Sequence, residues 1–153
     1  MGSRSNNDFA YIAGFLDGDG SLMLQIKKRR DGNKKWRFMA TICFYQDSRH
    51  ELPLAWIRDV LGIGYLSKRN DGMSELRING FAQVRDILKK LMPFIRFKKE
   101  QAKALYYAVG ILTKKPQSLN ELVDCILKIQ EHNYITKKKK TRKELYTMLD
   151  LTP

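Results

Sequence analysis

The strongest constraint on the fold is a pair of neighbouring segments in which apolar and polar residues alternate strictly. Leu22, Leu24 and Ile26 share one side of an extended chain, and the stretch 35–45 continues the alternation after a turn-forming Asp-Gly-Asn. In the second segment the residues on one side are Trp36, Phe38, Ala40, Ile42 and Phe44. A hairpin with one long apolar face is unstable alone, so other elements must cover that face.

The spacing of apolar residues elsewhere predicts those covering elements. Helices are expected over residues 8–18, 50–61, 81–91, about 98–112, 118–131 and 142–150, and a second hairpin is expected around the turn at 70–72. Asp8 or Asn7 is expected to cap the first helix, and Gly18 and Gly20 are expected to end it. In the helix over 50–61, the expected buried stripe is Leu52, Ala55, Trp56 and Val60.

The resulting order is α-β-β-α-β-β-α followed by further helices. It predicts an α+β fold in which a four-stranded antiparallel sheet has helices on one face and extra helices at the C-terminal end. A chain of 153 residues fits a single domain over 1–153. The opening MGSRSN, residues 1–6, is interpreted as partly a tag remnant or a disordered end and is given no function.

The charge balance points to a polyanionic partner. Lys and Arg number 29 against 16 Asp and Glu, a net charge of +13 that a small compact fold would otherwise not favour. Cys43 and Cys125 are far apart and form no CxxC pair, so neither a disulfide framework nor a zinc site is indicated. The apolar runs are too short to cross a bilayer, so we expect no membrane partner and an intracellular location.

The polar face of the predicted sheet is suited to DNA. Its expected members are Met23, Gln25, Lys27, Arg37, Met39, Thr41, Cys43, Tyr45, Ser67, Arg69, Glu75, Arg77 and Asn79. A solvated sheet face is the ordinary alternative, but many of these side chains can hydrogen-bond to base edges in a major groove, which admits a β-ribbon. The hairpin loop adds cations suited to phosphates, among them Arg29, Arg30 and Lys34. RNA fits less well because its major groove is deep and narrow.

The stretch DGDGS at residues 17–21 raises the question of a metal. An EF-hand calcium loop would need a glycine where this chain has Leu22 and a glutamate where it has Lys28, so that interpretation fails. An inert helix end with surface carboxylates is the second interpretation. In a third, Ala13, Gly14 and Gly18 lie on nearly one side of the helix, so two such helices could pack backbone to backbone.

Such a helix pair would bring two acidic helix ends together. Carboxylates at helix C-termini sit in an already negative field, which favours a divalent cation between them. Next to a cationic face that holds DNA, the obvious use of the metal is phosphodiester hydrolysis.

The segment YIAGFLDGDG resembles the motif of the LAGLIDADG homing endonucleases. GIGYLSKR, PFIRFKKEQA and KTRK are also similar to segments of the single-motif, homodimeric branch of that family. The resemblance extends over about the whole chain, and the sequence contains one copy of the motif. It implies the αββαββα fold with a saddle-like sheet.

The resemblance also implies roles for individual residues. Asp19 would bind the metal, with the Gly18 carbonyl beside it, and Asp17 matches a structural position of the motif. Gln46 would order active-site water, and Lys98 would organise that solvent or stabilise charge. A further basic residue of the family falls on Arg49 or His50, and Asp47 puts a negative charge close to the phosphate.

Two sets of residues are assigned to partners by the resemblance. The motif helix would form a homodimer through Ile12, Ala13, Gly14, Phe15, Leu16 and Asp17. The C-terminal run KKKKTRK has an ordinary interpretation as a solvated linker, but the family favours a clamp on the DNA backbone that includes Lys138, Lys140 and Arg142. The groove-face residues would read bases.

The function implied is a Mg²⁺-dependent endonuclease that cuts both strands of a long pseudo-palindromic DNA target and so promotes intron mobility. Mn²⁺ or Ca²⁺ would substitute for binding, and no small-molecule substrate is expected. The alternatives are an intron-splicing maturase and a non-cleaving DNA-binding protein of the same fold. An organelle, chloroplast or mitochondrion, is the expected location if the intron is organellar.

Overall fold

The computed structural model of the protein describes residues 5–28, 36–114, 117–133 and 138–152. Its elements, in chain order, are α1 (Asn6–Asp19), β1 (Gly20–Lys28), β2 (Trp36–Asp47), a 3₁₀ turn (Ser48–His50), α2 (Leu52–Leu61), β3 (Tyr65–Lys68), β4 (Met73–Asn79), α3 (Phe81–Leu91), α4 (Lys99–Leu112), α5 (Leu119–Glu131) and α6 (Arg142–Met148). This order confirms the predicted α+β arrangement.

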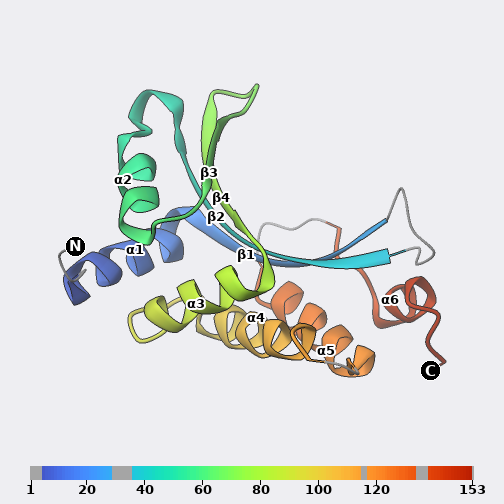
Figure 1. The fold of residues 1–153 in the computed structure, drawn as a ribbon. Helices are drawn as coiled ribbons and strands as arrows, with labels where there is room; N and C mark the ends of the chain where they lie inside the picture. The colour runs from blue at the N-terminus through green and yellow to red at the C-terminus, as the bar shows by residue number, and fades with distance from the viewer. Residues whose placement is uncertain (1–4, 29–35, 115–116, 134–137, 153) are drawn as a thin grey trace.

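The strands form one antiparallel sheet in the order β1-β2-β4-β3. Leu22 pairs with Ile42, which pairs in turn with Ile78, so the alternating apolar residues of three strands share one face. The described helices lie on that face, with α3, α4 and α5 beneath β1 and β2 and with α1 and α2 at one end of the sheet (Figure 1). None of them lies over the other face, and the sheet curves away from them.

The core lies between the sheet and these helices. Phe44 of β2 is fully buried, and the Phe15 ring of α1 packs against it at a centroid distance of 6.1 Å. On α3, the residues Val84, Ile87 and Leu88 are buried against the sheet side of the core. One continuous apolar cluster extends from α1 to Leu145 of α6.

The buried face of α2 differs from the predicted stripe. Leu54, Ile57, Val60 and Leu61 are buried, whereas the Leu52 side chain is 81% exposed and Trp56 is 39% exposed. The segment is apolar at nearly every position, so more than one stripe was compatible with its sequence. Trp56 packs edge-on against Tyr11 at the surface instead, with ring centroids 5.4 Å apart.

The first helix begins earlier than predicted and passes into the sheet without a loop. The cap is Ser5, whose side chain accepts a hydrogen bond from the Asp8 N–H, so neither Asp8 nor Asn7 is the cap and Ser5 and Asn6 belong to the fold. At the other end, β1 starts at Gly20 directly after the helix. None of the described helices is long and apolar enough to cross a membrane.

Gly20→Ala is expected to lower the free energy of unfolding by about 1–3 kcal/mol, the usual cost of overpacking. A Cβ at this position would lie 2.6 Å from Leu16 Cδ1 and 2.8 Å from the Leu16 carbonyl oxygen. Urea unfolding measures the change. Gly110→Ala is the matched control, because its Cβ would meet nothing within 4 Å. Alanine is the better helix former, so the free energy of unfolding should rise by about 0.5–1 kcal/mol at most. Equal effects of the two substitutions would contradict the close approach at Gly20.

Candidate functional site

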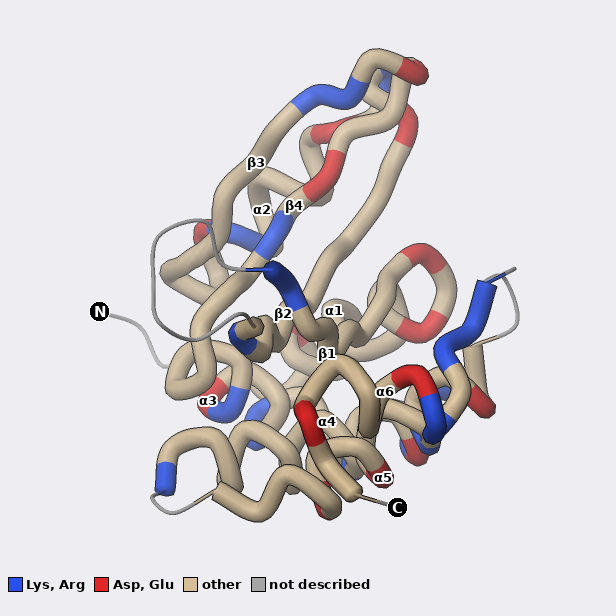
Figure 2. Tube along the Cα trace, turned by 90° about the vertical axis from the view of Figure 1, so that its right-hand side faces the viewer, with Lys and Arg blue, Asp and Glu red and all other residues tan. Residues whose placement is uncertain are grey.

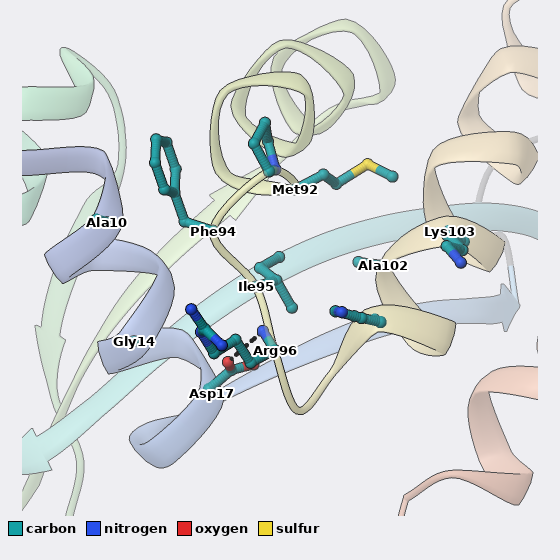
Figure 3. Close-up of a pocket in the computed structure, with 11 residues that line it drawn as sticks. Ala10, Gly14, Asp17, Met92, Phe94, Ile95, Arg96, Ala102 and Lys103 are labelled. Atoms are coloured by element: carbon teal, nitrogen blue, oxygen red, sulfur yellow. Dashed lines mark hydrogen bonds between the residues drawn. The ribbon is translucent and has the colours of Figure 1, made fainter. Parts of the chain in front are cut away.

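The carboxylate of Asp17 ties the end of α1 to the start of α4. Asp17 Oδ2 accepts hydrogen bonds from the backbone N–H groups of Arg96 at 2.8 Å and Phe97 at 3.1 Å, and Oδ1 accepts one from Lys98 at 3.0 Å. The donors precede the first turn of α4, where free N–H groups favour a negative charge. Figure 3 shows the contact to Arg96, with Asp17 pointing from α1 towards the chain segment that leads into α4. Asp17 therefore holds two distant parts of the chain together, the structural role that the resemblance implied.

Lys98 is held beside the acidic end of α1. Its Nζ donates a hydrogen bond to the Asp17 carbonyl oxygen at 2.7 Å. Burial lowers the pKa of the Lys98 ammonium, while the charges of Asp17 and Asp19 act in the opposite direction. The structure thus brings Lys98 and Asp19, two of the three predicted catalytic residues, within electrostatic reach of each other.

Asp19 offers an exposed carboxylate at the last residue of α1. It accepts no hydrogen bond from the described residues, and the Gly18 carbonyl lies in the final turn, where carbonyls lack helical partners. Both are oxygen donors of the kind that Mg²⁺ and Ca²⁺ prefer. The described residues contain no group of three or more His, Cys, Asp or Glu side chains that could hold a metal ion. Asp19 and Gly18 therefore fit a divalent cation only as part of a site that other donors complete.

Gln46 lies at the same end of the sheet, on the neighbouring strand. Gly20 pairs with Phe44, so Gln46 extends two residues beyond the start of β1 and lies near the level of Asp19. The Gln46 Oε1 accepts a hydrogen bond from the Asp47 N–H at 2.9 Å. Within the described part of the chain, no hydrogen bond engages the Gln46 NH₂ group. This group is therefore the end of the side chain that is left to face solvent.

The family resemblance implies that the negative charge of Asp47 lies close to the phosphate. In the structure this charge is already paired. Arg49 donates to the two carboxylate oxygens of Asp47 through Nε at 3.0 Å and Nη2 at 2.8 Å. These hydrogen bonds hold the pKa of Asp47 well below its usual value. Arg49 is thereby turned towards Asp47, whereas His50 is exposed at the end of the 3₁₀ turn.

The face of the sheet opposite the helices carries most of the predicted base-reading side chains. They are Gln25 and Lys27 on β1, Arg37 and Met39 on β2, Ser67 on β3, Glu75 and Arg77 on β4, and Arg69 directly after β3. Figure 2 shows basic positions along β3 and β4. The cations are partly paired within the face, with Arg77 3.4 Å from Glu75 and Arg69 2.8 Å from Asp71.

The prediction that Thr41 contacts DNA is wrong. Its side chain is fully buried, and its hydroxyl donates a hydrogen bond to Asn79 Oδ1 at 2.7 Å. By register, Thr41 lies on the face opposite the helices, which we call the outer face. Its side chain is short, however, and the strands on both sides cover it. Three other predicted contacts, Arg29, Arg30 and Lys34, lie outside the described residues.

The predicted partner-facing side of α1 needs a larger correction. Ile12, Ala13 and Leu16 are 0% exposed because they pack into the protomer's own core, so they cannot be contacts of a second chain. Phe15 is half-buried against Phe44, and the Asp17 carboxylate is engaged before α4. Only Gly14 of the six is exposed. The outer side of α1 instead presents small residues one turn apart, Ala10, Gly14 and Gly18.

The basic C-terminal segment is anchored from its backbone. Gln130 of α5 donates to the Lys140 carbonyl and accepts from the Lys140 N–H, both at 3.0 Å. Arg142 Nη1 lies 2.7 Å from Asp124 Oδ1, so its charge is paired. The side chains of Lys138 and Lys140 are exposed. The backbone is therefore held at Lys140, while the side chains of both lysines face solvent.

One exposed aromatic residue was missed on the base-reading face. Tyr65 pairs with Arg77 in the sheet and its side chain is 71% exposed. It lies two residues before Ser67, which was assigned to this face, so the period of two placed both side chains on the same face.

Comparison with known proteins gives a consistent result. The LAGLIDADG endonuclease family model matches residues 12–103. The DNA endonuclease I-CvuI of Chlorella vulgaris is 36% identical over 115 residues, which cover 74% of this chain and 71% of the relative. The DNA endonuclease I-CreI of Chlamydomonas reinhardtii is 27% identical over 125 residues, covering 81% of this chain and 76% of the relative.

Solved structures show the same fold. I-CvuI bound to the I-CreI target with Mg²⁺, with the DNA not cleaved, superposes with a TM-score of 0.82 at 28% identity over 95% of this chain and 96% of that one. A second I-CvuI structure holds its own target with Ca²⁺. The archaeal intron-encoded homing endonuclease I-Vdi141I, in complex with DNA, has a TM-score of 0.77 at 20% identity, covering 95% and 96% of the two chains.

Asp17→Asn is expected to lower the free energy of unfolding by about 1–3 kcal/mol, because an amide NH₂ would face backbone N–H donors and leave them unsatisfied. Thermal or urea unfolding measures the change. Asp86→Asn, which alters an exposed carboxylate on α3, should stay within about 0.5 kcal/mol of the parent protein. Unchanged stability of Asp17→Asn would show that the contacts with residues 96–98 do not hold the fold.

Proposed function

Because the chain belongs to the LAGLIDADG endonuclease family, we propose that it is a homodimeric, site-specific DNA endonuclease that needs a divalent cation, Mg²⁺ in the cell, and serves the mobility of its own intron. The observation that carries the proposal is the exposed Asp19 carboxylate, set beside Lys98 at one end of a sheet whose helix-free face carries basic and polar side chains. The organellar location stays a prediction.

The positions of the side chains suggest a role for each of them. The outer face of the sheet would follow the major groove, with Lys138 and Lys140 on the DNA backbone. Asp19 and the Gly18 carbonyl would hold the cation, which when bound supplies charge stabilisation at the scissile phosphate and a more acidic water. The Gln46 NH₂ group would orient that water. The Lys98 ammonium, held by the Asp17 carbonyl, would stabilise developing negative charge.

The incomplete donor set supports a second copy of the chain as a requirement for activity. One protomer provides a single exposed carboxylate at the end of α1. Beside that helix runs a groove of about 620 Å³, lined by Ala10, Gly14 and Asp17 of α1 and by residues 92–96. A second α1 packed along Ala10, Gly14 and Gly18 would bring two Asp19 residues close together, because small residues allow close backbone approach.

Asp19→Asn is expected to lower DNA cleavage by more than the roughly 10–100-fold loss typical of outer-shell metal partners, while duplex binding in Ca²⁺ persists. The measurement is selection of cleaved ends from a randomised duplex library with Mg²⁺, with Asp86→Asn as the control. The parent protein and the control should enrich one long two-fold-related site with staggered ends. Retained duplex without ends in the parent would favour a non-cleaving binding protein, and tighter binding to structured intron RNA would favour a maturase.

Gly14→Leu is expected to convert the dimer to a monomer, because a larger side chain would separate the two helices. The substitution should leave the protomer folded, since a Cβ at Gly14 meets nothing within 4 Å. Sedimentation equilibrium and circular dichroism test the two statements. Gly110→Leu, on α4 with the same open space, should remain dimeric. A dimeric Gly14→Leu variant would place the partner elsewhere.

A further inference from the structure

Asn79 ends β4 on the outer face of the sheet, the face proposed to meet DNA. It pairs with Thr41 across the strands, and Thr41 pairs with Met23 on the other side. The Asn79 side chain is exposed, whereas Thr41 beside it on β2 is fully buried. The two are joined by the hydrogen bond from the Thr41 hydroxyl to Asn79 Oδ1, at 2.7 Å.

This hydrogen bond fixes which end of the amide faces outward. The Thr41 hydroxyl is buried, and Asn79 is its one hydrogen-bond partner among the described side chains and backbone groups. If the amide were turned over, the hydroxyl would accept from Nδ2 and its own proton would have no acceptor. A buried donor without a partner costs about 1–3 kcal/mol. The carbonyl of Asn79 therefore points to Thr41, and the NH₂ group of this exposed side chain is turned away from Thr41.

The orientation limits what Asn79 can recognise. An asparagine reads adenine with both ends of its amide, accepting from N6 and donating to N7. With the carbonyl turned towards Thr41, the end of the amide that faces away from Thr41 can only donate. The major-groove acceptors that a lone donor can distinguish are keto oxygens, O6 of guanine and O4 of thymine, because adenine and cytosine carry amino groups at the same positions.

We propose that Asn79 is a specificity-determining residue that selects a keto base, guanine or thymine, at one position in each half of the DNA target, and that Thr41 is the positioning residue that holds it in this orientation. The inference rests on the proposed function, because it needs DNA on the outer face of the sheet. Thr41 would then influence base recognition without touching the DNA.

The test compares target preferences of variants at these two positions. The parent protein, Asn79→Ala, Asn79→Asp, Thr41→Val and Thr41→Ser are each used to select bound duplexes from a randomised library in Ca²⁺. The target position that Asn79 reads is identified as the one at which the Asn79→Ala variant no longer shows the base preference of the parent protein. Competition between two duplexes that differ there by one transition, guanine to adenine or thymine to cytosine, then gives the discrimination for each protein.

We expect the parent protein to favour the keto base by roughly two- to tenfold, the effect of a single hydrogen bond. Asn79→Asp presents a carboxylate oxygen in place of the NH₂ group, so its preference should move to the amino base of the same transition. Thr41→Val frees the amide to turn and should lose the discrimination, whereas Thr41→Ser, which keeps the hydroxyl, should retain it. Thermal melting checks that all variants fold, and preferences at other positions should not change.

Three results would overturn the proposal. An unchanged preference in Asn79→Asp would show that the outward group is not a donor. Full discrimination in Thr41→Val would show that Thr41 does not position the amide. A uniform loss of affinity across all positions would reduce Asn79 to a backbone contact. If the parent protein enriches no site at all, the proposed function fails and takes this inference with it, whereas an enriched site without the transition effect removes only the inference.

Discussion

The geometry at the end of α1 depends on the Asp17 carboxylate. Three backbone N–H groups of residues 96–98 converge on it, and the Asp17 carbonyl holds the Lys98 ammonium. Charged hydrogen bonds of this kind are stronger than neutral ones. One residue therefore fixes the start of α4, the position of Lys98 and the direction in which the helix delivers Asp19. The direct passage from helix to strand at Gly20 adds to this, because no loop lies between Asp19 and the sheet.

The sheet was the part most fully determined by local pattern. The period of two in β1, β2 and β4 predicted the apolar face and the outer face of the sheet. The same period in β3 puts Tyr65 on the outer face, but Tyr65 was not assigned to it. Burial on the outer face was not predictable, because Thr41 is covered by side chains from strands far away in the sequence. Similarly, α2 is apolar nearly all round, so only its tertiary neighbours select Leu54 and Ile57 over Leu52 and Trp56.

The error on α1 has a different cause. All six consecutive residues of the motif helix were assigned to the contact with a partner. A helix at an interface has two sides, however, and Ile12, Ala13 and Leu16 pack into the protomer's own core. The sequence contained the outer stripe, Ala10, Gly14 and Gly18, but small residues are compatible with either side. The roles of Asp19 and Lys98 came from the family resemblance, and their proximity became visible only in the folded chain, since they are far apart in sequence.

The ion pairs on the outer face bear on any attempt to retarget such a protein. Arg77 is paired with Glu75, and Arg69 with Asp71. In the proposed complex, each of these two arginines would therefore enter the groove together with an anion. A library that varies the arginines alone would leave uncompensated carboxylates facing a polyanion, and the resulting repulsion would be mistaken for poor base recognition. The useful unit of variation on this surface is the pair. Its sequence space should be sampled as coupled positions, because neighbouring charges of this kind do not contribute additively.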